Sequence, residues 1–437
     1  MKEYSEKELL MLSNFVYVPA SVSTAAISDI LDMYRDAEGG FTAQSVAPAG
    51  YGGGMGSDDI AVLFGEMDRQ VEEDPVFGQL SASRILEEED VRAICYTDKK
   101  DQNPVVAFRG TGGTVDAWTD NFEGAYERET KIQQIAGDFV HYECSEYEEI
   151  TVTGHSKGGN MAQFAAITCN DNVKRCVSYD GQGFGEEFIK SHRKEIKAAS
   201  PNIKSISAYN DFVNILLTCV AGEVIYVNNK EGAVNAHSSI SLLTENEYDE
   251  SGNFTSIQSR GMIAGGLKNA TDEIAFILRG VEKEDKKIMA RVAGDAIVGA
   301  FETLSDADPG SIAALAIGAV SDYYYRKITD TTSVVLGEGS LCVSDTSIMW
   351  NELNYMVSGL NGVIIRARVL KNRLQEMKED INYTIAAKIY AEKIVNRAIS
   401  SIETSVMNCE NYCNLLLEIA SRYRERENTV SGLFRVQ

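Results

Sequence analysis

The sequence is poor in proline and basic residues, and it lacks any long apolar run. The 6 prolines among 437 residues suit a fold with long helices. A membrane-spanning helix needs roughly 20 consecutive apolar residues, and the longest candidate, residues 311–321, is too short. We therefore expect no transmembrane segment. The opening octet MKEYSEKE has no apolar core, so we also expect no cleaved signal peptide.

Basic side chains are outnumbered throughout the first part of the chain. The whole sequence holds 41 lysines and arginines against 65 aspartates and glutamates, a net charge of -24. The acidic excess is concentrated in residues 1–260. Such a field repels nucleic-acid phosphates and gives no attraction to anionic membranes. We expect no nucleic-acid partner.

The eight cysteines form no CxxC pair and show no zinc-ligand spacing, which excludes the common zinc sites and argues against a disulfide framework. Cys409 and Cys413 lie on the apolar stripe of a predicted helix, where buried thiols are expected. The glycine-rich stretch 47–59 has neither the dinucleotide nor the P-loop spacing, so we interpret it as a surface loop. The sequence therefore predicts no metal and no cofactor.

Short apolar or β-branched runs alternate with helical patterns in the first 260 residues. The runs are residues 105–108, 149–153, 175–179, 204–209 and 222–227. This alternation predicts the α/β class, with a mostly parallel sheet covered by helices. Residues 261–333 read as a helical linker region rich in small residues, and residues 334–437 as an all-α module. We therefore predict three parts: 1–260, 261–333 and 334–437.

The motif Gly154-His155-Ser156-Lys157-Gly158 follows a predicted strand and opens a predicted helix. That context is typical of a nucleophile elbow, in which glycines allow a sharp turn that exposes the serine hydroxyl. The pattern predicts Ser156 as a catalytic nucleophile. The alternative is an ordinary strand-to-helix turn in which the serine caps the helix.

A serine nucleophile needs a base, and the sequence has only four histidines. The order Ser, acid, His of α/β-hydrolases leaves His192 and His237 as the two that follow Ser156. His192 lies in a basic stretch that we interpret as a solvated helix face, and His155 points the wrong way in an elbow. We predict His237 as the base, with a surface-loop histidine as the alternative.

Two aspartates at the ends of predicted strands can serve as the acid of a triad. Asp211 lies nearer His237 in the sequence and is preferred, whereas Asp180 is interpreted as a turn residue that shapes the pocket. An oxyanion hole needs two backbone N–H donors. One should come from Lys157, just after the serine, and the other from the glycine-containing loop 108–113.

These residues together resemble the class 3 lipase family, and most closely its bacterial Mbeg1-like branch. The resemblance covers about residues 1–260 and rests on VAFRGT at 106–111, Trp118, Asp120-Asn121, GHSKGG, YDGQGF at 179–184, Asn210-Asp211 and His237. It implies an α/β-hydrolase with the triad Ser156, Asp211 and His237. It also implies Thr111 and Lys157 as oxyanion donors, and an ester or lipid substrate. Gln182 stands where the branch commonly has proline.

The last hundred residues carry two apolar stripes at heptad spacing, one over 353–381 and one over 395–423. We predict an antiparallel helical hairpin that bends near 382–390. A lone hairpin buries little apolar surface, so its stripes call for a partner or for another part of the chain.

This hairpin resembles the WXG100 and LXG modules of type VII secretion substrates. Tyr423 and Glu427 fit their Y-x-x-x-D/E export pattern, although no W-x-G stands at the predicted bend. An enzyme placed before such a module resembles the reverse-arranged lipase effectors of that system. The resemblance implies export by a type VII system, and small WXG100-like accessory proteins bound at 334–437. The alternative is a cytoplasmic esterase or thioesterase with a helical oligomerisation tail. A non-catalytic binding protein on a hydrolase scaffold is disfavoured because the motif set is intact.

Overall fold

The computed structural model describes residues 3–258 with short gaps (51–54, 89, 99, 101–103, 112–114, 210, 212, 215 and 230–236), residues 283–303, residues 319, 320 and 323, and parts of 357–421. The chain forms two compact units, Met1–Ala313 and Ala314–Gln437, and each is described by itself. The three-part division expected from the sequence stays a prediction.

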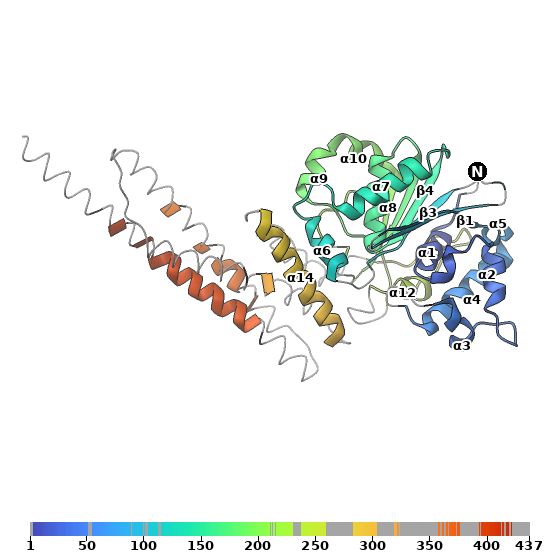
Figure 1. The fold of residues 1–437 in the computed structure, drawn as a ribbon, viewed down its shortest axis with the longest axis horizontal. Helices are drawn as coiled ribbons and strands as arrows, with labels where there is room; N and C mark the ends of the chain where they lie inside the picture. The colour runs from blue at the N-terminus through green and yellow to red at the C-terminus, as the bar shows by residue number, and fades with distance from the viewer. Residues whose placement is uncertain are drawn as a thin grey trace, which may run out of the picture. The chain divides into compact units, whose positions relative to one another are not determined.

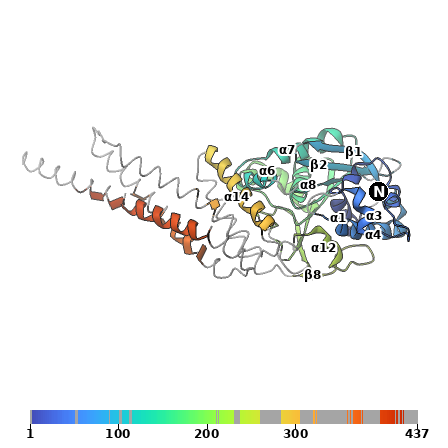
Figure 2. The ribbon, with the colours of Figure 1, turned by 60° about the horizontal axis from the view of Figure 1, so that its bottom comes forward.

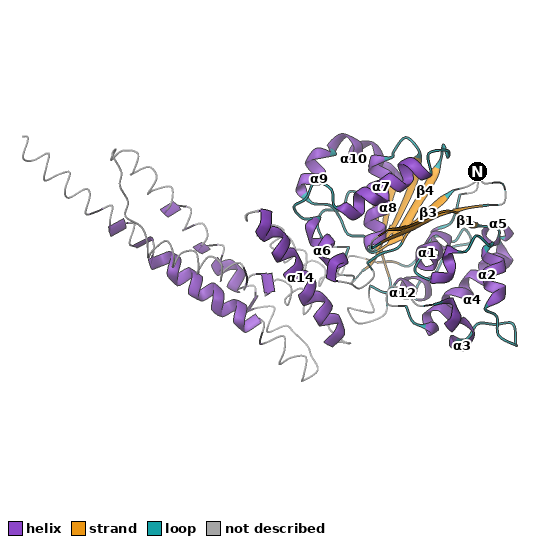
Figure 3. Ribbon diagram, viewed as in Figure 1, coloured by secondary structure: helices purple, strands orange, loops and turns teal. Residues whose placement is uncertain are grey.

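A single sheet forms the centre of the first unit, and its eight strands lie side by side in chain order. The strands are β1 Ser81–Glu88, β2 Val91–Thr97, β3 Val105–Phe108, β4 Ile150–His155, β5 Val173–Tyr179, β6 Ile203–Ala208, β7 Glu223–Val227 and β8 Ile257–Gln258. Strands β3 to β7 run parallel, and β1, β2 and β8 add antiparallel pairs at the two edges (Figure 3). The sheet confirms the predicted α/β-hydrolase class.

Helices cover both faces of this sheet (Figure 1). The connections between the parallel strands supply α6 Val115–Glu123, α7 Lys131–Asp138, α8 Lys157–Thr168, α9 Glu186–Ser191 and α10 Arg193–Ala199. The opposite face is covered mainly by α1 Glu6–Phe15, α2 Ile27–Met33, α4 Ser57–Glu73 and α12 Ser239–Thr244, with the short helices α3 Ala43–Val46 and α5 Pro75–Gly78 beside them. Short helical turns complete the fold at Pro19–Val22, Ala47–Ala49, Phe139–Glu143 and Ser200–Asn202.

The side chains of β3 show how the two faces are filled. Val105 and Ala107 belong to the apolar cluster beneath α1 and α4, whereas Val106 and Phe108 belong to the cluster beneath α7 and α8. All four are fully buried, as expected for a central parallel strand whose residues alternate between two covered faces. Such a sheet gives the loops at its carboxyl edge a rigid support.

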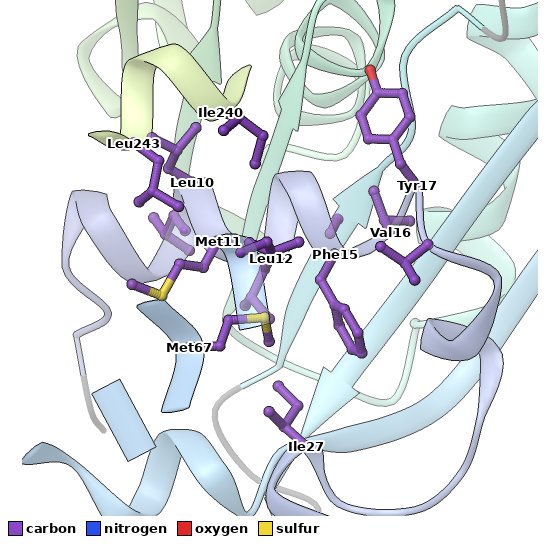
Figure 4. Packing of buried hydrophobic residues seen from close by; sticks show 14 of the residues in the cluster. Leu10, Met11, Leu12, Phe15, Val16, Tyr17, Ile27, Met67, Ile240 and Leu243 are labelled. Carbon is purple, nitrogen blue, oxygen red and sulfur yellow. The ribbon is translucent and has the colours of Figure 1, made fainter. Parts of the chain in front are cut away.

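Helix α1 begins at a capping box and ends beside the centre of the sheet. Ser5 caps it, because its side chain accepts from the Glu8 N–H at 3.1 Å while the Glu8 carboxylate accepts from the Ser5 N–H at 2.7 Å. Leu10, Met11 and Leu12 are fully buried in the cluster of Figure 4. Helix α1 packs against β4 on the face opposite α8, so the N-terminal segment is an integral layer of the domain.

Helix α14, Lys283–Thr303, belongs to the first unit and packs along α6 (Figure 2). Its Met289, Ala290 and Ala293 are fully buried. The Lys286 Nζ lies 5.5 Å from the centre of the Tyr126 ring, just after α6. Helix α14, which lies in the predicted linker region, therefore packs as part of the first unit.

The second unit is helical wherever it is described, at 319, 320 and 323 and within 357–375 and 393–421. The Lys371 ammonium lies 2.7 Å from the Glu403 carboxylate, and Arg368 pairs with Glu410. The later residue of the first segment, Lys371, pairs with the earlier residue of the second, Glu403, so the two segments run antiparallel. Cys409 and Cys413 are buried there against Ile364. Among the described residues, no helix is both long and apolar enough to cross a membrane.

Two features expected from the sequence lie outside the described residues. They are the predicted bend at 382–390 and the export pair Tyr423 and Glu427. Every cysteine that the structure describes is a free thiol.

Candidate active site

The chain turns sharply between β4 and α8, and Ser156 is the residue at the turn. Its φ of 60° and ψ of -126° lie in a region that L-residues rarely adopt. The flanking glycines are required sterically. A Cβ on Gly154 would lie 2.4 Å from the Gly158 carbonyl carbon, and one on Gly158 would lie 2.1 Å from the Phe108 carbonyl oxygen. The G-x-S-x-G motif therefore forms a strained elbow that holds the serine at the carboxyl edge of the sheet.

Three residues from separate loops at this edge form one hydrogen-bonded row. The His237 Nε2 lies 2.8 Å from the Ser156 Oγ, and the His237 Nδ1 lies 2.7 Å from the Asp211 Oδ1. Ser156 follows β4, Asp211 follows β6, and His237 precedes α12. Ser156 and Asp211 are buried, and His237 is half-buried. Each ring nitrogen of the histidine thus faces one of the two partners that the sequence predicts.

The Asp211 carboxylate is fixed by the chain that follows it. Its Oδ2 accepts from the Val213 N–H at 3.0 Å, from the Asn214 N–H at 2.7 Å and from the Asn214 Nδ2 at 3.0 Å. These bonds occupy one oxygen and leave the other for His237. Because the carboxylate is fully buried, the turn holds its orientation without help from solvent.

Asp180, the other candidate acid, occupies a different environment. It follows β5 with a φ of 48°, and its Oδ1 accepts from the Ala208 N–H at 2.8 Å. Its Oδ2 has no hydrogen-bond partner among the described residues and lies 3.8 Å from the His155 Nε2. Complete burial, and next the nearby Asp211 charge, raise the pKa of Asp180 well above its ordinary value. The structure places Asp211, and not Asp180, against His237.

The two residues predicted to supply oxyanion donors are Lys157, which directly follows the serine, and Thr111, which directly follows Gly110, a residue packed against the serine. Lys157 is the first residue of α8, so its N–H has no acceptor within the helix. Its side chain is buried and its ammonium pairs with the Asp120 carboxylate of α6, which also accepts from the Thr130 hydroxyl at 3.0 Å. Thr111 lies in the loop after β3, where its Oγ1 accepts a long 3.4 Å bond from the Asn121 Nδ2. Helix α6 thus contacts the elbow through Lys157 and the loop after β3 through Thr111.

Residues 81–273 match the Mbeg1-like family. That family is lipase-like, and the matched segment contains Ser156, Asp211 and His237. The match therefore supports a hydrolase of the lipase or esterase type. The structure of Lip2 lipase from Yarrowia lipolytica is similar with a TM-score of 0.28 and 14% identity, over 43% of this chain and 74% of that one. A likeness that weak bears on neither fold nor function. No curated protein matches the sequence.

One group of side chains near the serine has the composition of a metal site. Among the described residues, ligand atoms of His155, Asp180 and His237 lie within 4.8 Å of one another. Both ring nitrogens of His237 are already hydrogen-bonded to the serine and to Asp211, and the His155 Nδ1 faces the Tyr17 hydroxyl at 3.2 Å. A metal ion that took His237 as a ligand would have to displace one of the two contacts of that ring.

The remaining histidines lie away from the row. His192, expected on a solvated face, is instead buried, because its ring packs 4.5 Å from Phe188 and its Nε2 lies 2.7 Å from the Glu129 carboxylate. His141 is exposed on a helical turn before β4. Sequence reasoning missed Tyr17, which follows the end of α1 and contacts the elbow at His155. Asp120 belongs to the family resemblance, but the sequence gives no sign of its buried ion pair with Lys157.

Proposed function

We propose that the chain is a serine carboxylic ester hydrolase, with Ser156 as nucleophile, His237 as general base and Asp211 as the residue that orients the base. The observation that carries the proposal is the continuous hydrogen-bonded row at a strained strand-to-helix elbow. A buried serine on such an elbow, facing a histidine whose other nitrogen faces a carboxylate, is the arrangement that activates a hydroxyl for acyl transfer.

The reaction follows from which atom faces which. The Ser156 Oγ attacks the ester carbonyl while its proton passes to the His237 Nε2. The Asp211 Oδ1 accepts from the His237 Nδ1 and stabilises the positive ring that results. The N–H groups of Thr111 and Lys157 donate to the oxyanion of the tetrahedral intermediate. His237 then gives its proton to the departing alcohol, and water releases the acyl group by the same steps.

We propose lipid esters as the substrate class, because the matched family is lipase-like. The strongly acidic chain gives no attraction to anionic bilayers, so contact with lipid would rely on apolar surface or on a partner. Neutral lipids and phospholipids are both compatible with the geometry of the row.

Purified protein should be assayed on short soluble esters, triglyceride emulsions and phospholipid vesicles, with Ser156→Ala as the matched inactive control. We expect the wild type to hydrolyse at least one of these substrate classes, and the rate to fall by about a thousandfold or more in the variant. Equal rates from the two proteins would trace the activity to a contaminant or to another site.

We further propose that the C-terminal unit directs export by a type VII system, with small WXG100-like helical proteins bound to it. The antiparallel segments support this, since they present Ile365, Val369, Met407 and Leu417 with exposed fractions of 62, 44, 54 and 53%. Apolar side chains exposed along one helical pair are typical of a surface that further helices cover. The alternative is a cytoplasmic esterase in which the same surface joins copies of this chain.

The export proposal is tested in full-length protein, in a bacterium that has a type VII system and the small genes beside this one. Tyr423→Ala with Glu427→Ala should abolish export and leave the specific activity of the intracellular enzyme unchanged. Tyr142→Ala with Glu143→Ala, an exposed pair on the first unit, is the matched control and should be exported normally. A protein that is never exported, captures no small helical partner and self-associates would instead support the oligomerisation tail.

A further inference from the structure

Tyr17 reaches the candidate active site from a part of the chain outside the family match. It follows the C-terminal end of α1, where its neighbours Phe15 and Val16 are buried in the apolar cluster. In Figure 4 its hydroxyl points away from that cluster. The side chain is 4% exposed, so the hydroxyl is buried at the carboxyl edge of the sheet.

The Tyr17 hydroxyl contacts two loops of the site. It accepts from the Gly110 N–H at 2.9 Å, across 93 residues of sequence. It also lies 3.2 Å from the His155 Nδ1, across 138 residues. Gly110 directly precedes the proposed oxyanion donor Thr111, and His155 directly precedes the nucleophile. One hydroxyl therefore joins the oxyanion loop to the elbow.

The direction of these bonds is determined by the protonation of the two side chains. Burial raises the pKa of Tyr17, so the phenol keeps its proton. Burial, and next the neighbouring His237, lower the pKa of His155 well below its ordinary value, partly opposed by the His237 backbone. Gly110 therefore donates to Tyr17, and the donor between Tyr17 and His155 depends on which ring nitrogen of the neutral imidazole carries the proton. Neither bond depends on a charge.

The far side of the His155 ring packs on the base. The rings of His155 and His237 lie 4.7 Å apart at an interplanar angle of 36°. The space around the Gly110 Cα is also filled. A Cβ there would lie 2.2 Å from the Tyr17 Oη and 3.1 Å from the Ser156 Cβ. The oxyanion loop thus lies directly against both the nucleophile and the tyrosine hydroxyl.

We propose that Tyr17 and His155 are positioning residues, which hold the oxyanion loop and His237 in register with Ser156. The inference rests on the proposed hydrolase function and assigns the N-terminal helical segment a part in it. Neither residue touches the reacting atoms. Tyr17 acts through the peptide that leads into Thr111, and His155 acts through the ring of the base.

Tyr17→Phe tests this most simply, because it removes one oxygen and keeps the ring. The Gly110 N–H and the His155 Nδ1 would lose their shared partner, and the loop would be free to shift. Small displacements of catalytic groups can reduce rates by roughly tenfold to a hundredfold. We expect kcat on a soluble ester to fall by that factor with KM nearly unchanged, and the affinity for a boronic acid that mimics the tetrahedral intermediate to fall in parallel.

Tyr96→Phe is the matched control. Tyr96 is 1% exposed and belongs to the same apolar cluster, so its variant loses an equally buried hydroxyl remote from the triad. It should change the melting temperature without changing kcat or boronic acid affinity. A purely structural role for Tyr17 would give the same pattern in both variants.

His155→Asn provides a second, independent test of the inference in case Tyr17→Phe does not fold. It should also lower kcat more than it alters KM. The double variant should be no slower than the slower single variant, because both act through one chain of contacts. Normal kcat and boronic acid affinity in a folded Tyr17→Phe or His155→Asn protein would overturn the inference. A wild type that neither hydrolyses esters nor reacts with a fluorophosphonate would instead refute the proposed function.

Discussion

Replacing Asp211 with asparagine should invert the hydrogen bonding of His237 while leaving the fold intact. The Asp211 Oδ2 accepts from three N–H donors of Val213 and Asn214. In the variant, the amide oxygen must occupy that position, because an NH₂ group there would face only donors. The NH₂ group is then directed at the His237 Nδ1, which becomes an acceptor. The ring proton moves to Nε2, where it opposes the Ser156 hydroxyl.

A base in this tautomer cannot take the proton of the serine. The wrong tautomer in a Ser-His-Asp triad costs about ten-thousandfold in kcat. Each factor of ten corresponds to about 1.4 kcal/mol of activation free energy, so the barrier should rise by about 5 kcal/mol. Unfolding stability should change far less, since every donor around position 211 keeps an acceptor.

The assay is hydrolysis of a soluble ester by Asp211→Asn and Asp180→Asn, each checked by thermal melting. Asp180 is the matched control, because it is equally buried at the end of the neighbouring strand. Asp180→Asn should keep at least about a tenth of the wild-type kcat. A folded Asp211→Asn protein with near-normal kcat, or an inactive Asp180→Asn protein, would refute the assignment and favour Asp180 as the acid.

Two further predictions concern stability. The raised pKa of Asp180 means that the folded state keeps a proton the unfolded state has lost, so stability should fall as pH rises above the ordinary carboxyl value. The melting temperature of Asp180→Asn should therefore depend less on pH, between about pH 5 and 9, than that of the wild type. Identical slopes of melting temperature against pH in the two proteins would contradict this. Asp120→Ala should cost about 3–5 kcal/mol in urea unfolding, because it strands the buried Lys157 ammonium. Asp120→Leu with Lys157→Met should recover much of that loss, and no recovery would mean that the ion pair is not its cause.

The sequence was sufficient for those parts of the fold that carry a local signal. The predicted runs 105–108, 149–153, 175–179, 204–209 and 222–227 correspond to the five parallel strands, of which β3 to β6 are mostly buried and β7 is mostly exposed or half-buried. The antiparallel strands β1, β2 and β8 were not predicted. The residues of β1, SASRILEE, are mostly polar and partly exposed, so they give no clear alternation.

The same limit applies to the site. The elbow at Ser156 could be predicted because so sharp a turn needs glycines at fixed neighbouring positions, and the order of the chain then restricted the choice of candidate base. Tyr17 could not be found in this way, since its contact with Gly110 spans 93 residues and a tyrosine at the end of an apolar helix has no distinguishing pattern. His192 was misjudged for the related reason that its partner, Glu129, lies 63 residues away.

The central claim is that Ser156 is a nucleophile activated by His237, and the covalent adduct with a fluorophosphonate tests it most directly. Intact mass and peptide mapping should show one adduct on wild-type protein, located at Ser156. The labelling rate should fall by about a thousandfold in His237→Ala, and no adduct should form in Ser156→Ala. Unchanged labelling of Ser156→Ala, or an adduct mapped to another serine, would contradict the account.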